Sequence, residues 1–194
     1  HNRFVNDRYG LHLMYDDGLE INNNLLAQNF VGAFLMYSWH ITFERNTCLN
    51  NRGVSGYGLG IKNINDIRAA NNRILNNQVG IWMNSSPSSL DATNLFQRNV
   101  LAYNDAGLML DPSDQGNGFT ENTFMNNSQQ VSKDADGPLE GNEFSLAGRG
   151  NYWSDYKGYP GPDPAIGAIP YRVQNLFASL ADQSDVLVDF SSPA

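Results

Sequence analysis

The sequence contains a single cysteine, Cys48, so no disulfide can form within the chain. A lone thiol is compatible with both a reducing cytosol and a periplasm, so cysteine usage leaves the compartment open. No apolar run approaches the roughly 18 residues of a membrane span, and we expect no direct membrane insertion. No secretory leader is recognisable, but the first residues already fit a repeat. We therefore interpret the sequence as a piece of a longer chain. The lack of a recognisable leader then does not indicate whether that chain is exported.

Charged side chains are also scarce, at 16% of the residues against about a quarter in an average protein. The 12 Lys and Arg residues are outnumbered by 20 Asp and Glu residues, which gives a net charge of −8. This surplus of negative charge repels nucleic acids and anionic membranes, so neither is expected as a partner. It is compatible with a metal cation or a basic protein surface.

What the sequence has instead is a repeat of asparagine and glycine. A glycine, replaced by Gln in the last copy, opens each of six short apolar-containing runs, at Gly10, Gly32, Gly53, Gly80, Gly107 and Gln130. Three residues before these stand Asp7, Asn29, Asn50, Asn77, Asn104 and Asn127. About eight residues before them stand Asn2, Asn24, Asn46, Asn72, Asn99 and Asn122. Asparagine tolerates the left-handed backbone of a tight bend and glycine turns without a Cβ, so these columns predict bends.

The runs that follow the glycines alternate in polarity. The first and third residues are nearly all apolar, at Leu11, Ala33, Val54, Ile81 and Leu108 and at Leu13, Leu35, Gly56, Met83 and Leu110. The residues between them are His12, Phe34, Ser55, Trp82 and Met109. A period of two is typical of a strand with one buried face. With about 24 residues per repeat, the pattern predicts an all-β fold, a right-handed parallel β-helix of about six coils.

The repeat fades after Gln130, and a solenoid needs its open end covered. We therefore expect the coils to span residues 1–144 and a loop and helix cap to span residues 145–194. Helical spacing within the cap is shown by Val173, Leu176, Phe177 and Leu180. The extra residues of the longer coils predict loops around 58–67 and 85–91. Leucine-rich repeats and calcium-binding β-rolls are disfavoured, because their fixed leucines and aspartates are absent.

The segment GRGNYWSDY at 148–156 resembles the C-terminal signature of the NosD family. The segments RYGLHLMY at 8–15, GAFLMYS at 32–38 and IPY at 169–171 are also similar to that family, so the resemblance covers nearly the whole chain. It implies a periplasmic accessory protein without enzymatic activity that delivers copper to nitrous oxide reductase. It also implies three further partners, namely the ATPase subunit of an ABC transporter, its membrane subunit and a copper-carrying lipoprotein.

One segment departs from the family. Members often carry an acidic loop after the signature, whereas residues 158–167 of this sequence keep Asp163 as their one carboxylate. Because calcium needs six or more oxygen ligands, this departure argues against a calcium site in the loop.

Copper(I), the cargo that the resemblance implies, prefers thioether, thiolate and imidazole ligands. His12 and Met14 alternate on the outer face of the first coil, and Met36 follows Met14 one coil later. Stacked coils would bring the two sulfurs within about 5 Å of each other, with His40 just past the next bend. We predict His12, Met14, Met36 and His40 as metal ligands. The alternative is that these side chains only cover the surface.

Two other sets of residues have simpler interpretations. Cys48 falls in a small, mostly apolar column with Val5, Ala27, Leu75, Ala102 and Met125, so we expect it to pack rather than to ligate.

The outward aromatic residues Phe34 and Trp82 share a column with His12, and we predict that they dock a partner protein. Aromatic residues of this kind also stack on sugars.

The alternative function is carbohydrate binding or degradation, which other β-helix proteins carry out. Glycoside hydrolysis requires two carboxylates at a set separation. Asp16 and Asp17 are adjacent, but Ser38 and Trp39 occupy the corresponding positions of the next coil. A lyase would need an acidic cluster with a neighbouring cation, and residues 133–136 are the nearest match. We therefore expect no enzymatic activity.

Overall fold

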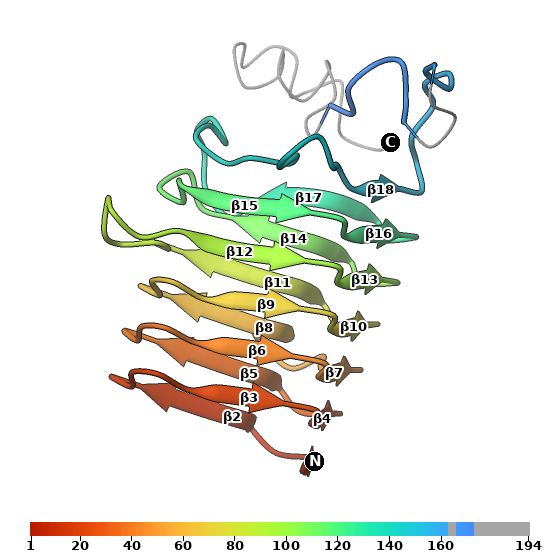
Figure 1. The fold of residues 1–194 in the computed structure, drawn as a ribbon. Helices are drawn as coiled ribbons and strands as arrows, with labels where there is room; N and C mark the ends of the chain where they lie inside the picture. Colours follow the sequence, from red (N-terminus) through yellow and green to blue (C-terminus); the bar gives the residue numbers. More distant parts are fainter. Residues whose placement is uncertain (163–165, 173–194) are drawn as a thin grey trace. The chain divides into compact units, whose positions relative to one another are not determined.

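The computed structural model describes residues 1–162 and 166–172. Its strands form three parallel sheets, and successive coils contribute one strand to each sheet (Figure 1). The predicted all-β fold, a parallel β-helix of about six coils, is confirmed. No helix with the length and hydrophobicity to cross a membrane occurs in this part of the chain.

Each coil runs through a short strand, a long strand and a second short strand. The seven-stranded sheet contains β1 (Arg3–Val5), β4 (Leu25–Ala27), β7 (Thr47–Leu49), β10 (Arg73–Leu75), β13 (Val100–Ala102), β16 (Thr123–Met125) and β18 (Tyr152–Trp153). The six-stranded sheet contains β2 (Tyr9–Met14), β5 (Val31–Met36), β8 (Tyr57–Lys62), β11 (Val79–Asn84), β14 (Ala106–Leu110) and β17 (Gln129–Lys133). The five-stranded sheet contains β3 (Glu20–Asn22), β6 (Thr42–Glu44), β9 (Arg68–Ala70), β12 (Asn94–Gln97) and β15 (Asn117–Thr120).

Buried asparagines hold the coils together at the bends. Asn72, for example, accepts hydrogen bonds from the backbone and side-chain nitrogens of Asn46, and donates to Asn99 Oδ1 at 2.9 Å. This ladder consists of Asn24, Asn46, Asn72, Asn99, Asn122 and Asn151. A second ladder consists of Asn29, Asn51, Asn77, Asn104 and Asn127. Each amide satisfies backbone groups that a bend leaves unpaired, which explains the asparagine repeat.

The predicted alignment of the third coil is wrong. Leu59, not Val54, lies in register with Ala33, so the glycine of this coil is Gly58 rather than Gly53. Residues 58–62 therefore belong to β8, and the inserted loop precedes this strand instead of occupying 58–67. The glycine is required because a Cβ on Gly58 would lie 2.8 Å from the carbonyl oxygen of Gly80 in the next coil. Asn51, rather than the predicted Asn50, joins the ladder.

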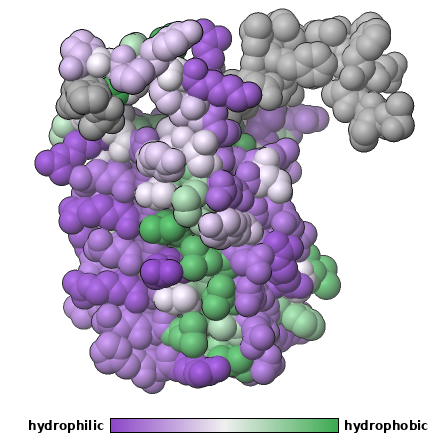
Figure 2. Space-filling view, turned by 90° about the vertical axis from the view of Figure 1, so that its right-hand side faces the viewer, coloured by the Kyte–Doolittle hydropathy of each residue, from purple (hydrophilic) through white to green (hydrophobic). Residues whose placement is uncertain are grey.

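The predicted packing of Cys48 is confirmed, but the column predicted for it is wrong by one residue. Cys48 pairs with Leu26 and Ile74 and points into the core, where burial raises the pKa of its thiol to about 12. The column with which it was grouped lies on the outer side of the same strands and contains Leu49 in place of Cys48. It consists of Val5, Ala27, Leu49, Leu75, Ala102 and Met125. Figure 2 looks onto this side of the stack and shows an apolar band along it.

The family-like signature closes the last complete coil. Asn151 extends the asparagine ladder from Asn122, and Trp153 pairs with Phe124 in register. The Trp153 ring stacks on Phe124 with 4.3 Å between centroids. Residues 1–155 form one compact unit, and a second unit begins at Tyr156. Asp163 and the predicted helical residues from Val173 onward lie outside the described residues.

Candidate functional site

The outer surface of β2 and β5 carries three of the four predicted metal ligands. Along these strands Ala33 and Leu35 are fully buried, while their neighbours in the sequence face outward. His12 is exposed and Met14 has 39% of its surface exposed. The alternation read from the sequence therefore places these side chains as predicted.

Met14 and Met36 are direct partners in the parallel register of β2 and β5. Strands paired in this way lie about 4.8 Å apart, so both thioethers project from the same side of the sheet. We refer to Met14 and Met36 as the thioether pair. In the third coil Lys62 takes the next place in the column, in register with Met36. The column of soft ligands therefore ends at an ammonium group, which opposes the binding of a cation beside Met36.

His12 lies two residues before Met14 and is held by aromatic neighbours. Its ring centroid is 4.7 Å from that of Tyr9 and 5.9 Å from that of Phe34, with both pairs stacked. The rings of Tyr9 and Phe34 lie only 6.2 Å apart, so they flank the imidazole from one side, and the exposed edge of His12 carries the nitrogen lone pair that binds a metal. No hydrogen-bond partner of His12 occurs among residues 1–162 and 166–172, so this edge is not otherwise engaged.

His40 lies past the bend that follows β5 and is engaged by two carboxylates. Its Nδ1 lies 2.7 Å from Asp17 Oδ1, and its Nε2 lies 3.8 Å from Asp66 Oδ2. The hydrogen bond and charge of Asp17, together with the charge of Asp66, raise the pKa of the imidazole. Because a metal binds the neutral imidazole, His40 would have to lose its Nε2 proton before it could act as a ligand, although Nδ1 could keep donating to Asp17.

The raised pKa of His40 predicts a pH-dependent contribution to stability. The contribution is fully present below the ordinary imidazole pKa and is lost as the pH rises through the raised value. His40→Asn removes the titrating group, and asparagine tolerates the positive φ of 49° at this position. Between about pH 6 and about pH 8, the free energy of unfolding of the wild type should fall relative to that of the variant. Urea unfolding at several pH values measures this difference, and parallel pH profiles would refute it.

Phe34 and Trp82, the predicted docking residues, lie close together on the same sheet. They are two coils apart, but their ring centroids are separated by 5.9 Å. Gly60 lies between them in register, and a Cβ there would approach the Phe34 ring to 2.6 Å. The glycine therefore lets the two rings meet over the intervening strand.

Two tyrosines that the sequence did not single out complete this surface. Tyr57 stacks on Trp82 with centroids 4.9 Å apart, and Tyr9 stacks on His12. Tyr57 was missed because the third coil was aligned on Gly53. The run Gly58-Leu59-Gly60-Ile61 was the signal that could have corrected it, since it matches residues 32–35. We define the aromatic cluster as Tyr9, His12, Phe34, Tyr57 and Trp82.

The orientation of the cluster is fixed from a distant coil. Trp82 Nε1 donates a hydrogen bond to Asp134 Oδ2 at 2.9 Å. Burial, with a contribution from the charge of Asp134, raises the pKa of Tyr57 and keeps its phenol neutral. Tyr57 and Trp82 stack on each other and Phe34 is tilted at 51° to both, so these rings contact one another before any partner binds.

Comparison with known proteins points to one family. A family model described as "Periplasmic copper-binding protein (NosD)" matches residues 1–158. A protein of Pseudomonas aeruginosa named "Probable ABC transporter binding protein NosD" is 30% identical over 137 residues, which cover 65% of this chain and 31% of that protein. A protein of the same name from Stutzerimonas stutzeri is 34% identical over 79 residues, which cover 41% of this chain and 17% of that protein. The chain thus spans less than a third of the length of these relatives.

Among the described residues, no three His, Cys, Asp or Glu side chains gather in a way that could hold a metal ion. The soft donor side chains that share one outer face are instead those of the thioether pair and His12. A site built from them would suit copper(I) and would be a poor site for hard cations such as calcium.

Proposed function

The chain belongs to the NosD family, and from this premise we propose that it is part of a periplasmic accessory protein that delivers copper to nitrous oxide reductase. Copper is the cargo, bound as copper(I) between acquisition and delivery. The observation that carries the proposal is the thioether pair, with His12 two residues away on the same outer face. Two thioethers and an imidazole are soft donors, and the pairing of β2 with β5 already holds the backbones of Met14 and Met36 side by side, so only the side chains have to be ordered on binding.

The contribution of the thioether pair can be measured with a leucine double variant. Met14→Leu combined with Met36→Leu keeps the apolar volume and removes both sulfurs. We expect the affinity for copper(I) to fall at least about ten-fold, measured under anaerobic conditions in competition with a chromophoric chelator. Met125→Leu, on the outer side of the seven-stranded sheet, is the matched control and should bind as the wild type does.

A third variant tests the same site in the opposite direction. Lys62→Met removes the ammonium group beside Met36 and extends the thioether column by one coil, so it should tighten copper(I) binding. Equal affinities of the wild type and the leucine double variant would exclude the thioether pair as the copper site.

Docking of the partner proteins is proposed for the aromatic cluster. The relatives are named as binding proteins of an ABC transporter, which supports contact with the membrane subunit of such a transporter, through which the ATPase subunit on the cytoplasmic side would be engaged. A copper-carrying lipoprotein would supply the ion, and the reductase would receive it. Phe34 and Trp82 lie at the centre of the cluster, where aromatic side chains contribute most to a protein interface.

Truncation of the central rings should weaken docking of the reductase. We expect Phe34→Ala combined with Trp82→Ala to cost at least about 2 kcal/mol of binding free energy, measured by calorimetry with purified nitrous oxide reductase. Tyr152→Ala removes an exposed aromatic ring from the seven-stranded sheet and should leave the affinity unchanged. Unaltered binding by the Phe34 and Trp82 variant would place the interface elsewhere.

A further inference from the structure

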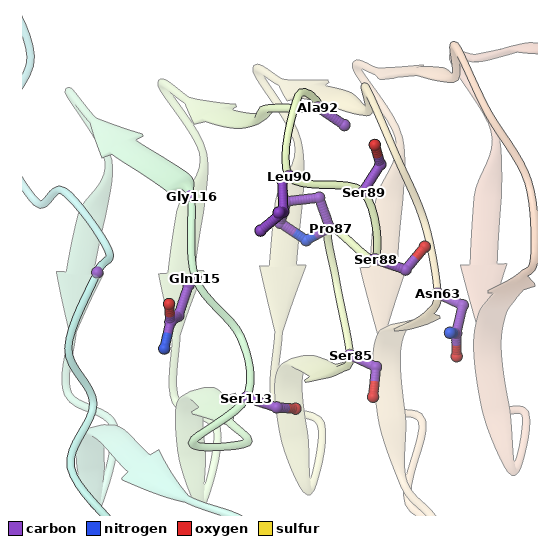
Figure 3. Close-up of a pocket in the computed structure, with 11 residues that line it drawn as sticks. Asn63, Ser85, Pro87, Ser88, Ser89, Leu90, Ala92, Ser113, Gln115 and Gly116 are labelled. Atoms are coloured by element: carbon purple, nitrogen blue, oxygen red, sulfur yellow. The ribbon is translucent and has the colours of Figure 1, made fainter.

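A cleft of about 580 Å³ opens between two loops on successive coils. One loop follows β11 and spans 85–92, and the other follows β14 and spans 111–116 (Figure 3). Sites for small ligands commonly have volumes of this size. The cleft shares no residue with the thioether pair or the aromatic cluster.

Buried polar side chains hold the first loop in place. Asn65 is buried, and its Oδ1 accepts hydrogen bonds from the backbone nitrogens of Ser88 and Ser89 at 2.8 and 3.0 Å. Asp114 is also buried, and its carboxylate accepts from the backbone nitrogens of Ser86 and Asp111, both at 2.8 Å. The walls of the cleft are therefore fixed before any ligand binds, which lowers the entropic cost of binding.

The lining of the cleft is polar but carries no charge. Its polar side chains are hydroxyls and amides, from Asn63, Ser85, Ser88, Ser89, Ser113 and Gln115. Four of them, those of Asn63, Ser85, Ser89 and Gln115, have no hydrogen-bond partner among the residues that the structure describes. Figure 3 shows these groups around the cleft, with Pro87 and Leu90 near the centre of the view and Ala92 at its upper edge. Leu90 is fully exposed, so a ligand that covered it would remove apolar surface from water.

This lining selects a class of ligand. A phosphate or a carboxylate would find no cation in the lining, and a metal ion would find no carboxylate there. A neutral polyhydroxylated molecule offers hydroxyls to the free amides and hydroxyls, and it offers apolar C–H surface to Leu90 and Pro87. We propose that the cleft, hereafter the hydroxyl cleft, binds a short neutral saccharide. It binds without cleaving, because hydrolysis needs a pair of carboxylates at the bound sugar.

The test is a titration of isotope-labelled protein, followed by backbone amide NMR, with three neutral probes. The probes are maltotriose, cellotriose and triacetylchitotriose, and trigalacturonate serves as the anionic counterpart. We expect at least one neutral probe to produce saturable shifts confined to residues 85–92 and 111–116. Trigalacturonate should bind at least about ten-fold more weakly, since its carboxylates would lose water without gaining a cation.

Two variants connect the shifts to the cleft. Leu90→Asp places a charge at the apolar part of the lining and should abolish saturable binding. Ser89→Ala combined with Gln115→Ala removes two free polar side chains and should weaken binding about ten-fold. Val54→Asp is the control: it also replaces an exposed apolar side chain with a carboxylate, but outside the cleft. It should bind the neutral probes as the wild type does. Absence of saturable shifts with all three neutral probes, or shifts that persist in Leu90→Asp, would overturn the proposal. Neither result depends on copper binding or on docking of the reductase.

Discussion

Replacing Trp153 with alanine should lower the free energy of unfolding by about 3–5 kcal/mol. Trp153 has only 8% of its surface exposed, and its ring stacks on Phe124 with 4.3 Å between centroids and lies 6.0 Å from Phe144. Phe124 is a fully buried residue of the last complete coil. Alanine would leave that coil open to water, because no other side chain of β18 covers it. Urea unfolding followed by far-ultraviolet circular dichroism measures the loss.

Two further variants of β18 show whether the loss of stability comes from the packing of the Trp153 ring or from any change in this strand. Tyr152→Ala changes the exposed residue of the same strand and should alter stability by less than about 0.5 kcal/mol. Trp153→Phe keeps an aromatic ring over Phe124 and should lose less than the alanine variant does. If Trp153→Ala and Tyr152→Ala destabilise the protein equally, the signature does not close the core through Trp153.

Replacing Asn99 with alanine should have an effect of similar size, about 3–5 kcal/mol, although no apolar packing is lost. Asn99 Nδ2 donates to Ala69 O and to Asn122 Oδ1, both at 2.9 Å. Its Oδ1 accepts from the backbone nitrogen of Asn72 at 3.0 Å and from Asn72 Nδ2 at 2.9 Å. All of these residues are buried, so alanine would leave several polar groups without a partner at about 1–3 kcal/mol each.

The control for this prediction is an exposed amide. Gln129→Ala removes an exposed side chain of β17 and should change stability by less than about 0.5 kcal/mol. Asn99→Asp keeps the accepting oxygen and the shape but loses the donor and buries a charge, so it should destabilise as well. A cost of Asn99→Ala no greater than that of Gln129→Ala, measured by urea unfolding, would show that the ladder does not stabilise the coils.

Much of the fold could be predicted because each coil repeats the same local constraints. Asn24 and Asn72 mark bends in the sequence because their side-chain amides hydrogen-bond to backbone groups at the bends. Asn24 Oδ1 accepts from the backbone nitrogen of Asn2, and Asn72 Nδ2 donates to the carbonyl oxygen of Phe43. The alternation of Ala33, Phe34 and Leu35 is likewise a local pattern with a direct structural meaning. A third asparagine ladder consists of Asn94, Asn117 and Asn142. The repeat did not predict it, because loops of unequal length precede these residues and hide their regular spacing.

The errors arose where coil length changes. The insertion before β8 moved the third coil out of the predicted alignment, and one residue of slip assigned Cys48 to the outer column. In a strand a slip of one residue exchanges the two faces, so Cys48 was given the wrong neighbours, although its predicted packing is confirmed. The correct register depends on which residues pair between coils, for example Ala33 with Leu59. The spacing of residues along the chain does not specify this pairing.

The sequence by itself determined the parallel β-helix, the outward direction of His12, Met14 and Met36, and the resemblance to the NosD family. These follow from periodicity and from motifs, which are local properties of the chain. The tertiary structure alone decided that Tyr57 stacks on Trp82, that Asp134 binds the same ring, and that two loops enclose the hydroxyl cleft. The physical reason is that these neighbours come from different coils, and only the stacking of coils, with loops of unequal length between them, brings them together.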